Sequence, residues 1–144
     1  MRVLVQRSKN SSVTVDGKMI SSINRGLVLL VGFTYGDSLA DIEKLAKKIV
    51  NLRIFDDDVG VMNRSILDVG GEILSISQFT LYANTSKGNR PSYIDALNGE
   101  EAILLYEKFN QILNQYVVAK PGVFGADMKV TILNDGPVTI LLES

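Results

Sequence analysis

Three polar side chains stand close together at the end of an apolar segment of the sequence. Residues 73–77 have the pattern of a buried strand, and Ser77, Gln78 and Thr80 fall where that strand ends. Strand ends on rigid scaffolds often carry binding and catalytic residues, although many of them are only turns. The hydroxyl and amide groups of these residues are therefore a candidate site, and the alternative is a strand whose polar face is wet.

The composition of the chain limits the chemistry of any such site. The 144 residues include no histidine and no cysteine. This excludes Ser-His-Asp and Cys-His triads, zinc sites with nitrogen or sulfur ligands, haem or iron–sulfur ligation and thiol redox couples. Catalysis has to use hydroxyls, carboxylates, lysine, arginine, main-chain amides or the substrate itself, and we expect neither a metal nor a cofactor.

A second candidate feature is the Gly136-Pro137 step. It lies in residues 134–139 (Asn-Asp-Gly-Pro-Val-Thr), between two apolar segments, residues 128–133 and 138–142, which are predicted to close the chain as a β-pair. Because proline cannot continue a central ladder, a tight turn is expected here. A Gly-Pro step directly before a strand is also where a cis peptide bond would sit. Such a bond would fix the direction of the Gly136 carbonyl, with no side chain in the way.

The strands that must position these residues follow from the apolar pattern. Residues 2–7 and 12–15 are rich in β-branched side chains, and Asp16-Gly17 is a two-residue hairpin signal that leads into residues 18–23. Residues 26–33 form a continuous apolar run between glycines, which is typical of a central strand covered on both faces.

Two helices are predicted. Ser38 and Asp41 have the spacing of a capping box before the first helix, and the second begins near Glu100 and Glu101, where acids suit the positive end of the helix dipole. Each helix carries an apolar stripe that we expect to face the core. The stripes are Leu39, Ile42, Leu45, Ala46, Ile49 and Val50 in the first helix, and Ala102, Leu105, Tyr106, Phe109, Ile112, Leu113 and Tyr116 in the second.

Shorter elements lie between these helices. Residues 52–55, 73–77 and 81–82 are predicted strands. The acidic run of residues 56–58 lacks the spacing and the distal glutamate of a calcium loop, so it is interpreted as a solvated hairpin turn. Gly70-Gly71 is interpreted as a tight turn, since no helix with phosphate-loop spacing follows it.

Composition and charge set the class of protein. With 46% hydrophobic and 22% charged residues and no linker or repeat, residues 1–144 are predicted to be one α/β domain with two main helices. The longest apolar run is far shorter than the ~20 residues of a membrane span, and no signal peptide is recognisable, so a cytoplasmic location is expected. A net charge of −1 offers no broad positive field for DNA or RNA, so it favours a small-molecule partner, and a polyanion would have to be held by local patches.

Seven segments of the chain, in this order, carry a family resemblance: residues 5–7, 13–17, 52–55, 77–83, 87–92, 124–128 and 134–139. Residues 77–81 contain the pattern Ser-Gln-x-x-Leu, and residues 134–139 contain Asn-x-Gly-Pro-x-Thr. In these segments the chain resembles the D-aminoacyl-tRNA deacylase family. One departure is Ala-Lys-Pro-Gly at residues 119–122, where a Thr-Gly lead-in is more typical, and it concerns the entrance of the pocket.

The resemblance implies a β-barrel-like core flanked by helices and a reaction. The family hydrolyses the ester between a D-amino acid and the terminal ribose of tRNA, and it also removes mischarged glycine. Main-chain amides around Phe79 and Thr80, beside Ser77 and Gln78, are implied to cradle the scissile carbonyl, while the ribose 2′-hydroxyl helps to activate water. The competing mechanism makes Thr80 a covalent nucleophile, which needs a nearby base, and there is no histidine to serve.

The resemblance also implies how mirror images are separated. An apolar pocket distinguishes a methylene by only about 1–3 kcal/mol. In the family, a cis Gly-Pro pair enters the pocket of the partner subunit of a homodimer and occupies the space of an L side chain; Gly136 and Pro137 are implied to do so here. Arg7 is implied to orient that turn through its fork of donors, the alternative being a surface arginine. Phe124 and Met128 are implied to pack around the terminal adenine, the alternative being ordinary core.

The expected partner is thus the aminoacylated end of tRNA, and Lys87 and Arg90 could meet its phosphates. Two other functions stay open. One is a non-catalytic module that binds the tRNA acceptor end, against which the intact motifs argue. The other is a small-molecule esterase, which the negative net charge favours.

Overall fold

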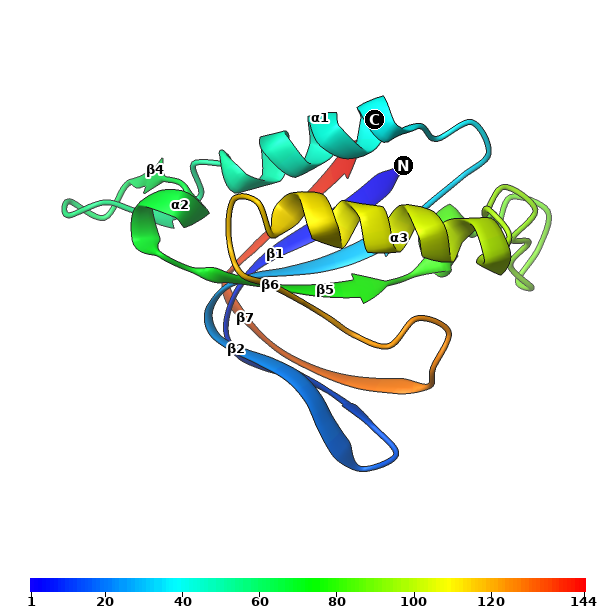
Figure 1. Cartoon of the computed structure of the whole chain (residues 1–144), viewed down its shortest axis with the longest axis horizontal. Helices are drawn as coiled ribbons and strands as arrows, with labels where there is room; N and C mark the ends of the chain where they lie inside the picture. The colour runs from blue at the N-terminus through cyan, green and yellow to red at the C-terminus, as the bar shows by residue number, and fades with distance from the viewer.

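A curved five-stranded sheet with helices on one face makes up the fold (Figure 1). The computed structural model describes residues 1–144. The strands are β1 (Arg2–Val15), β2 (Lys18–Gly32), β5 (Glu72–Ser77), β6 (Ala119–Pro121) and β7 (Met128–Glu143), hydrogen-bonded in the order β6-β5-β2-β1-β7. β1 is antiparallel to β2 and β7, whereas β5 is parallel to β2 and β6. The predicted α/β fold is confirmed. Because no ladder joins β6 to β7, the sheet is open and only loosely barrel-like.

The helices α1 (Leu39–Val50) and α3 (Gly99–Leu113) lie side by side over the sheet (Figure 1). The smaller elements are the one-turn helix α2 (Ile66–Val69), the 3-10 helix η1 (Phe79–Tyr82) and a hairpin of β3 (Phe55–Asp56) and β4 (Met62–Arg64). The predicted capping box of α1 is present, because Ser38 and Asp41 exchange the expected hydrogen bonds. None of the helices combines the length and the apolar character needed to cross a bilayer.

The β1–β2 hairpin confirms the Asp16-Gly17 prediction. Both residues have positive φ, 49° and 75°, as a tight two-residue turn requires. The far ends of β1 and β2 and the first half of β7 bend away from the helices (Figure 1). Because of that bend, a second small core forms on the sheet face opposite the helices: Val13, Ile23, Val28, Leu74 and Ile76.

The prediction of a central strand at residues 26–33 is confirmed, since β2 is the third of the five strands. Its side chains alternate between the two cores: Leu27 and Leu29 face the main core, while Val28 faces the second. The stripe of α3 is buried at Tyr106 and Phe109 among others. Tyr116 is an exception because α3 ends at Leu113, which leaves Tyr116 46% exposed.

The predicted closing β-pair is wrong. Residues 128–133 and 138–142 belong to one strand, β7, and both halves pair with β1. Gln6 pairs with Thr139 and Ser8 with Asn134, so residues 135–138 lie opposite the single residue Arg7. The chain makes a local excursion instead of a reversal, because β1 offers a continuous partner on either side of it. The Gly136-Pro137 peptide bond within the excursion is cis.

Two other predicted strands are corrected. In residues 52–55 only Phe55 belongs to a strand, since the preceding residues find no strand neighbour after α1 ends. Residues 81–82 belong to η1, where the Leu81 N–H donates to the Gln78 carbonyl over 3.3 Å. The helix α2 was not predicted, although Ser65 and Asp68 form the same capping box as in α1.

The turns predicted at residues 56–58 and 70–71 are confirmed. The first lies in the β3–β4 hairpin, where the Asp57 carboxylate accepts the N–H groups of Val59 and Val61, both over 3.0 Å. In the second, Gly70 ends α2 with a left-handed φ of 61°. Asp57 and Gly70 therefore serve local backbone geometry.

Candidate functional site

A pocket of about 530 Å³ lies at the carboxyl end of β5. Ser77, Gln78 and Phe79 form one wall of it, and Phe124 and Met128 form another. The end of β2 and the start of α3 complete the lining. Five of the residues that the sequence predicted as a site are thus brought together from segments far apart in the chain.

The strand end creates two free main-chain donors beside this pocket. The Gln78 N–H donates to the Val31 carbonyl over 2.7 Å, which extends the β5–β2 pairing by one bond. The chain then turns into η1, and the N–H groups of Phe79 and Thr80 form no hydrogen bond with any backbone or side-chain acceptor. The first N–H groups of a helix have no partner within it, so these amides remain available to an oxyanion or a carbonyl.

The side chains of this wall are neutral. Gln78 Nε2 donates to Thr80 Oγ1, and Thr80 makes no other side-chain hydrogen bond. The only ionisable side chain in the lining is Asp127, whose carboxylate pairs with Lys129 Nζ over 3.0 Å in an exposed position. No group of three or more His, Cys, Asp or Glu side chains is placed to hold a metal ion. The pocket therefore offers hydrogen-bond donors and apolar surface, with no strong base.

The wall that carries Phe124 and Met128 is fixed from behind by Tyr106. The Tyr106 ring packs against Phe124 with 5.8 Å between centroids, and its hydroxyl donates to the Ser75 carbonyl over 2.7 Å. The same carbonyl accepts the Gly122 N–H over 2.8 Å. Burial raises the pKa of Tyr106, so its hydroxyl stays protonated as a donor. A Cβ on Gly122 would come within 2.6 Å of Met128 Sδ, so this segment lies close against the pocket wall.

Arg7 lies away from the pocket and is buried, with 8% of its surface exposed. Its Nε donates to the Asp135 carbonyl over 3.2 Å, and its Nη1 donates to the Ile54 carbonyl over 2.8 Å. Nη1 also pairs with the Asp56 carboxylate at 3.2 Å. Arg7 is therefore not a surface arginine, because its guanidinium joins the excursion of β7 to the loop before β3.

Gly136 and Pro137 are exposed and do not line the pocket. Arg7, opposite the turn, aligns across the sheet with Ile73, whereas the pocket lining on β5 begins at Ile76. Three residues of strand separate these levels by roughly 10 Å, and the turn also lies on the edge strand. Within one chain the turn and the pocket are therefore separate features.

A loop borders the pocket on the side of Phe79, whose ring meets the Tyr93 ring edge-on at 5.0 Å. Asn84 and Ser92 close the loop by an antiparallel bridge. Lys87 and Arg90 lie between them, and both are exposed. Their cationic groups are thus available to an anion beside the pocket.

Several residues of the pocket were not predicted as site residues, among them Gly99, Ala102 and Asp127. Asp127 stands inside one of the segments that carry the resemblance, so that segment could have drawn attention to it. Gly99 and Ala102 reach the pocket because the start of α3 packs beside β5, and no local pattern indicates this.

One protein family matches the chain over nearly its whole length. The family model described as D-Tyr-tRNA(Tyr) deacylase matches residues 4–143. The D-aminoacyl-tRNA deacylase of Bacteroides thetaiotaomicron is 56% identical over 146 residues, which cover 100% of this chain and 97% of that protein. The D-aminoacyl-tRNA deacylase of Parabacteroides distasonis is 54% identical over 147 residues, with the same two coverages.

Two solved structures share the fold. One, described as c-Myc DNA Unwinding Element Binding Protein, has a TM-score of 0.95 and 43% identity and covers 100% of this chain and 99% of that one. The other, described as a probable eukaryotic D-amino acid tRNA deacylase, has a TM-score of 0.83 and covers 98% of this chain and 97% of that one. At 16% identity, the second likeness shows the fold alone.

Proposed function

The chain belongs to the D-Tyr-tRNA(Tyr) deacylase family, and we propose that it hydrolyses the ester bond of D-aminoacyl-tRNA in the pocket at the end of β5. The observation that carries this assignment is the pair of unpaired N–H groups on Phe79, which lines the pocket, and on Thr80, the residue that follows it. Preorganised main-chain donors of this kind stabilise the oxyanion of an acyl-transfer reaction.

The reaction adds water across the ester. The water oxygen attacks the carbonyl carbon, and the carbonyl oxygen gains negative charge that the amides of Phe79 and Thr80 stabilise. The bond to the ribose oxygen then breaks, and that oxygen takes a proton and leaves as a hydroxyl of tRNA. The other product is the free D-amino acid. Because an aminoacyl ester is already reactive, orientation and oxyanion stabilisation account for most of the required acceleration.

The base in this reaction belongs to the substrate. Thr80 Oγ1 accepts a hydrogen bond from Gln78, and no carboxylate or amine contacts it. A threonine needs an adjacent base to act as a nucleophile, so the neutral surroundings disfavour that role. The ribose 2′-hydroxyl next to the scissile ester is the group that activates water. Ser77 and Gln78 shape this wall and hold Thr80 in place.

The terminal adenosine occupies the other part of the pocket. The half-buried Phe124 ring and the Met128 thioether give a flat, polarisable surface on which a single-stranded base stacks. Lys87 and Arg90 lie in the exposed loop beside Phe79, where phosphates of the acceptor end pass. This local pair of cations compensates for the net charge of −1.

We also infer that the enzyme is a homodimer whose partner turn completes each pocket. β7 is an edge strand of 16 residues that carries the exposed Gly136 and Pro137 in its middle and exposes Leu133 and Leu141. Long exposed edges with apolar side chains are prone to pair with another chain. Since the turn lies away from the pocket of its own chain, it reaches a pocket only in a second copy.

In that arrangement the turn discriminates between mirror images. Gly136 and Pro137 present main-chain atoms, which cannot change rotamer to make room, in the space where an L side chain would point. A D-aminoacyl group directs its side chain elsewhere, and a glycyl group has none, so both are accepted. Arg7 holds the turn by its bond to the Asp135 carbonyl.

A pair of substrates tests the proposal. Hydrolysis of matched D- and L-aminoacyl-tRNA is compared, and then the D substrate is prepared with hydrogen in place of the 2′-hydroxyl. Of the two enantiomers, we expect only the D substrate to be cleaved. The deoxy form of the D substrate should react at least ~100-fold more slowly, the usual range for a lost general acid–base group.

Equal rates on the two enantiomers would remove the proofreading function, and binding without turnover would favour the tRNA-binding module. Equal turnover of free amino-acid esters would favour the small-molecule esterase.

A further inference from the structure

A second cleft, of about 680 Å³, lies behind Phe124, between α3 and the segment that joins β6 to β7. Figure 1 shows α3 running along that segment. The mechanism makes no use of this cleft. Phe124 is the only residue that lines both it and the catalytic pocket, so the side chain forms a partition between the two.

The cleft carries an excess of hydrogen-bond acceptors. Asn114 is fully engaged, since its amide bonds Asn110 and both main-chain groups of Ala119. The Asn110 amide nitrogen donates to the Tyr106 carbonyl, but its Oδ1 is buried and has no partner. Glu107 is exposed, and its carboxylate makes neither an ion pair nor a hydrogen bond. The missing partner is therefore a donor, preferably one with two hydrogens.

The lining also indicates what the donor is attached to. No lysine or arginine lines the cleft, so it does not suit a phosphate. The Phe124 ring, Pro121 and Val123 offer flat apolar surface, and Gln111 adds a free amide. Aromatic and apolar surface combined with amides and a carboxylate is how proteins bind unstacked nucleobases. A base with an exocyclic amino group fits this chemistry, and a glutamate carboxylate is a recognised acceptor for the amino group of cytosine.

We propose that this cleft binds the base of the penultimate nucleotide of the tRNA acceptor end, a cytosine. The inference rests on the proposed function, because it is the terminal adenosine in the neighbouring pocket that brings the preceding base to the other side of Phe124. The cytosine amino group donates toward Glu107 and Asn110, and its ring stacks beside Phe124. The cleft thereby reads a feature common to all tRNA acceptor ends and distinguishes them from other adenosine esters.

The experiment uses three short substrates: the D-alanyl esters of adenosine, of the dinucleotide CpA and of the dinucleotide UpA. For the unmodified enzyme we expect KM for the CpA ester to be about tenfold below that of the adenosine ester, a typical gain for one stacked and hydrogen-bonded base. The UpA ester should lose most of the gain, because uracil has an acceptor where cytosine has its amino group.

Two variants with matched controls locate the effect. Glu107→Gln keeps the size of the side chain but removes the carboxylate, and Glu43→Gln makes the same change on α1. Gln111→Ala removes the free amide, and Gln115→Ala makes the same change just beyond α3. The CpA-to-UpA ratio of kcat/KM within each protein is the measurement, since a general loss of stability does not move it. We expect both cleft variants to lower the ratio at least threefold, and both controls to retain it.

The possible failures are distinguishable. Equal KM for the adenosine and CpA esters, or a CpA preference that survives both Glu107→Gln and Gln111→Ala, would overturn the base site and leave the deacylase assignment intact. If the enzyme cleaves none of these esters and no D-aminoacyl-tRNA either, the proposed function itself is wrong.

Discussion

The pocket at the end of β5 and the turn on β7 are built in opposite ways. The pocket is lined mainly by apolar side chains, and its only ionisable lining residue, Asp127, is paired with Lys129. The turn is held by a buried arginine, Arg7, whose donors go to two carbonyls and to the Asp56 carboxylate. The charged groups at the turn therefore fix the backbone, whereas the pocket presents mainly apolar side chains.

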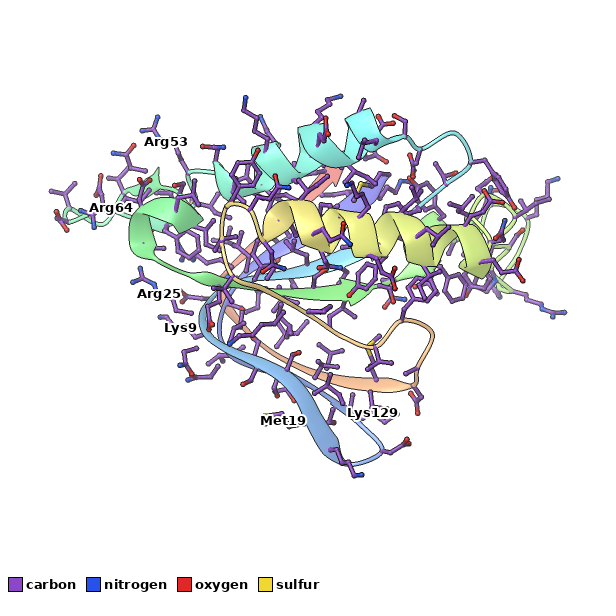
Figure 2. The ribbon with its side chains drawn as sticks, in the orientation of Figure 1. Lys9, Met19, Arg25, Arg53, Arg64 and Lys129 are labelled. Atoms are coloured by element: carbon purple, nitrogen blue, oxygen red, sulfur yellow. The ribbon has the colours of Figure 1, made fainter.

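Figure 2 shows where four of the cationic side chains lie. Arg53 and Arg64 lie toward the end that carries α2 and the β3–β4 hairpin, and in this view Lys9 and Arg25 lie on the same side. Lys9 pairs with Asp135 at 3.3 Å, next to the turn. A pocket with no free ionisable side chain suits a substrate that supplies its own base, while a rigid turn suits a function that depends on fixed geometry.

The largest effect is expected from Arg7→Leu. The change removes donors from the Ile54 and Asp135 carbonyls, and the Ile54 bond is buried, so the free energy of unfolding should fall by about 3 kcal/mol. Urea denaturation measures the loss. The D-to-L ratio of aminoacyl-tRNA hydrolysis should fall as well, because the turn is less firmly held.

Arg64→Leu is the control for charge alone, because Arg64 forms an exposed ion pair with Asp58 at 2.7 Å. Exposed pairs contribute about 0–1 kcal/mol, so this variant should stay close to the unmodified protein. If both variants lose equal stability, the contrast between a charged turn and a neutral pocket has no energetic basis.

A smaller effect is expected from Gly136→Ala. Gly136 has φ +120°, and an added Cβ would lie 2.8 Å from Val138 Cγ2 and 3.1 Å from Arg7 Nη2. Gly88 also has a positive φ, +142°, but an added Cβ would meet nothing within 4 Å. Gly88→Ala therefore shows the effect of φ alone, about 1 kcal/mol, and Gly136→Ala should lose about 1 kcal/mol more.

The kinetic contrast between these two glycine variants is sharper than the difference in stability. Gly136→Ala should change the D-to-L ratio, while Gly88→Ala should leave it unchanged. An unchanged ratio in Gly136→Ala, with the fold intact by circular dichroism, would separate the turn from chiral discrimination.

On the pocket side, Thr80→Ala should lower kcat less than tenfold. The hydroxyl accepts a hydrogen bond from Gln78, and its removal leaves the main-chain N–H of Thr80 in place. Single-turnover hydrolysis of D-aminoacyl-tRNA measures the chemical step. A variant as slow as the uncatalysed reaction, with an unchanged near-ultraviolet spectrum, would revive Thr80 as the nucleophile.

Local signals predicted much of the fold. Asp16-Gly17 specifies a two-residue turn by backbone geometry, and Ser38 with Asp41 specifies a helix start by side-chain hydrogen bonds, so neither depends on distant residues. The same reasoning applied to Ser65 and Asp68 would have found α2. Turns and helix starts of this kind can be predicted from sequence because the interactions that specify them join residues no more than four positions apart.

The errors concern partners that are distant in sequence. Nothing within residues 128–142 reveals that both halves of β7 pair with β1, and a Gly-Pro step resembles a reversal until that partner is known. The residues of the site show the same contrast between local and distant determinants. The segment from Ser77 to Thr80 carries a motif, whereas Ala102 enters the pocket through helix packing and the contact of Arg7 with Ile54 depends on tertiary structure.

The smallest effect should come from acid acting on the starts of α1 and α2, away from both the pocket and the turn. Hydrogen bonds from Ser38 lower the pKa of Asp41, and hydrogen bonds from Ser65 lower the pKa of Asp68. A carboxyl group with a lowered pKa stabilises the fold above its unfolded value of about 3.9, and this stabilisation is lost as the pH falls through the folded value. Urea midpoints at pH 3 and pH 6 should therefore differ less in the double variant Asp41→Asn, Asp68→Asn than in the unmodified protein. Glu43→Gln, which removes a carboxylate that caps nothing, should keep the full difference.

Activity on D-aminoacyl-tRNA at pH 7 should not change in either variant, because these capping boxes contribute no side chain to the pocket. A loss of activity in the double variant alone would show that the start of α1 or α2 is coupled to the site.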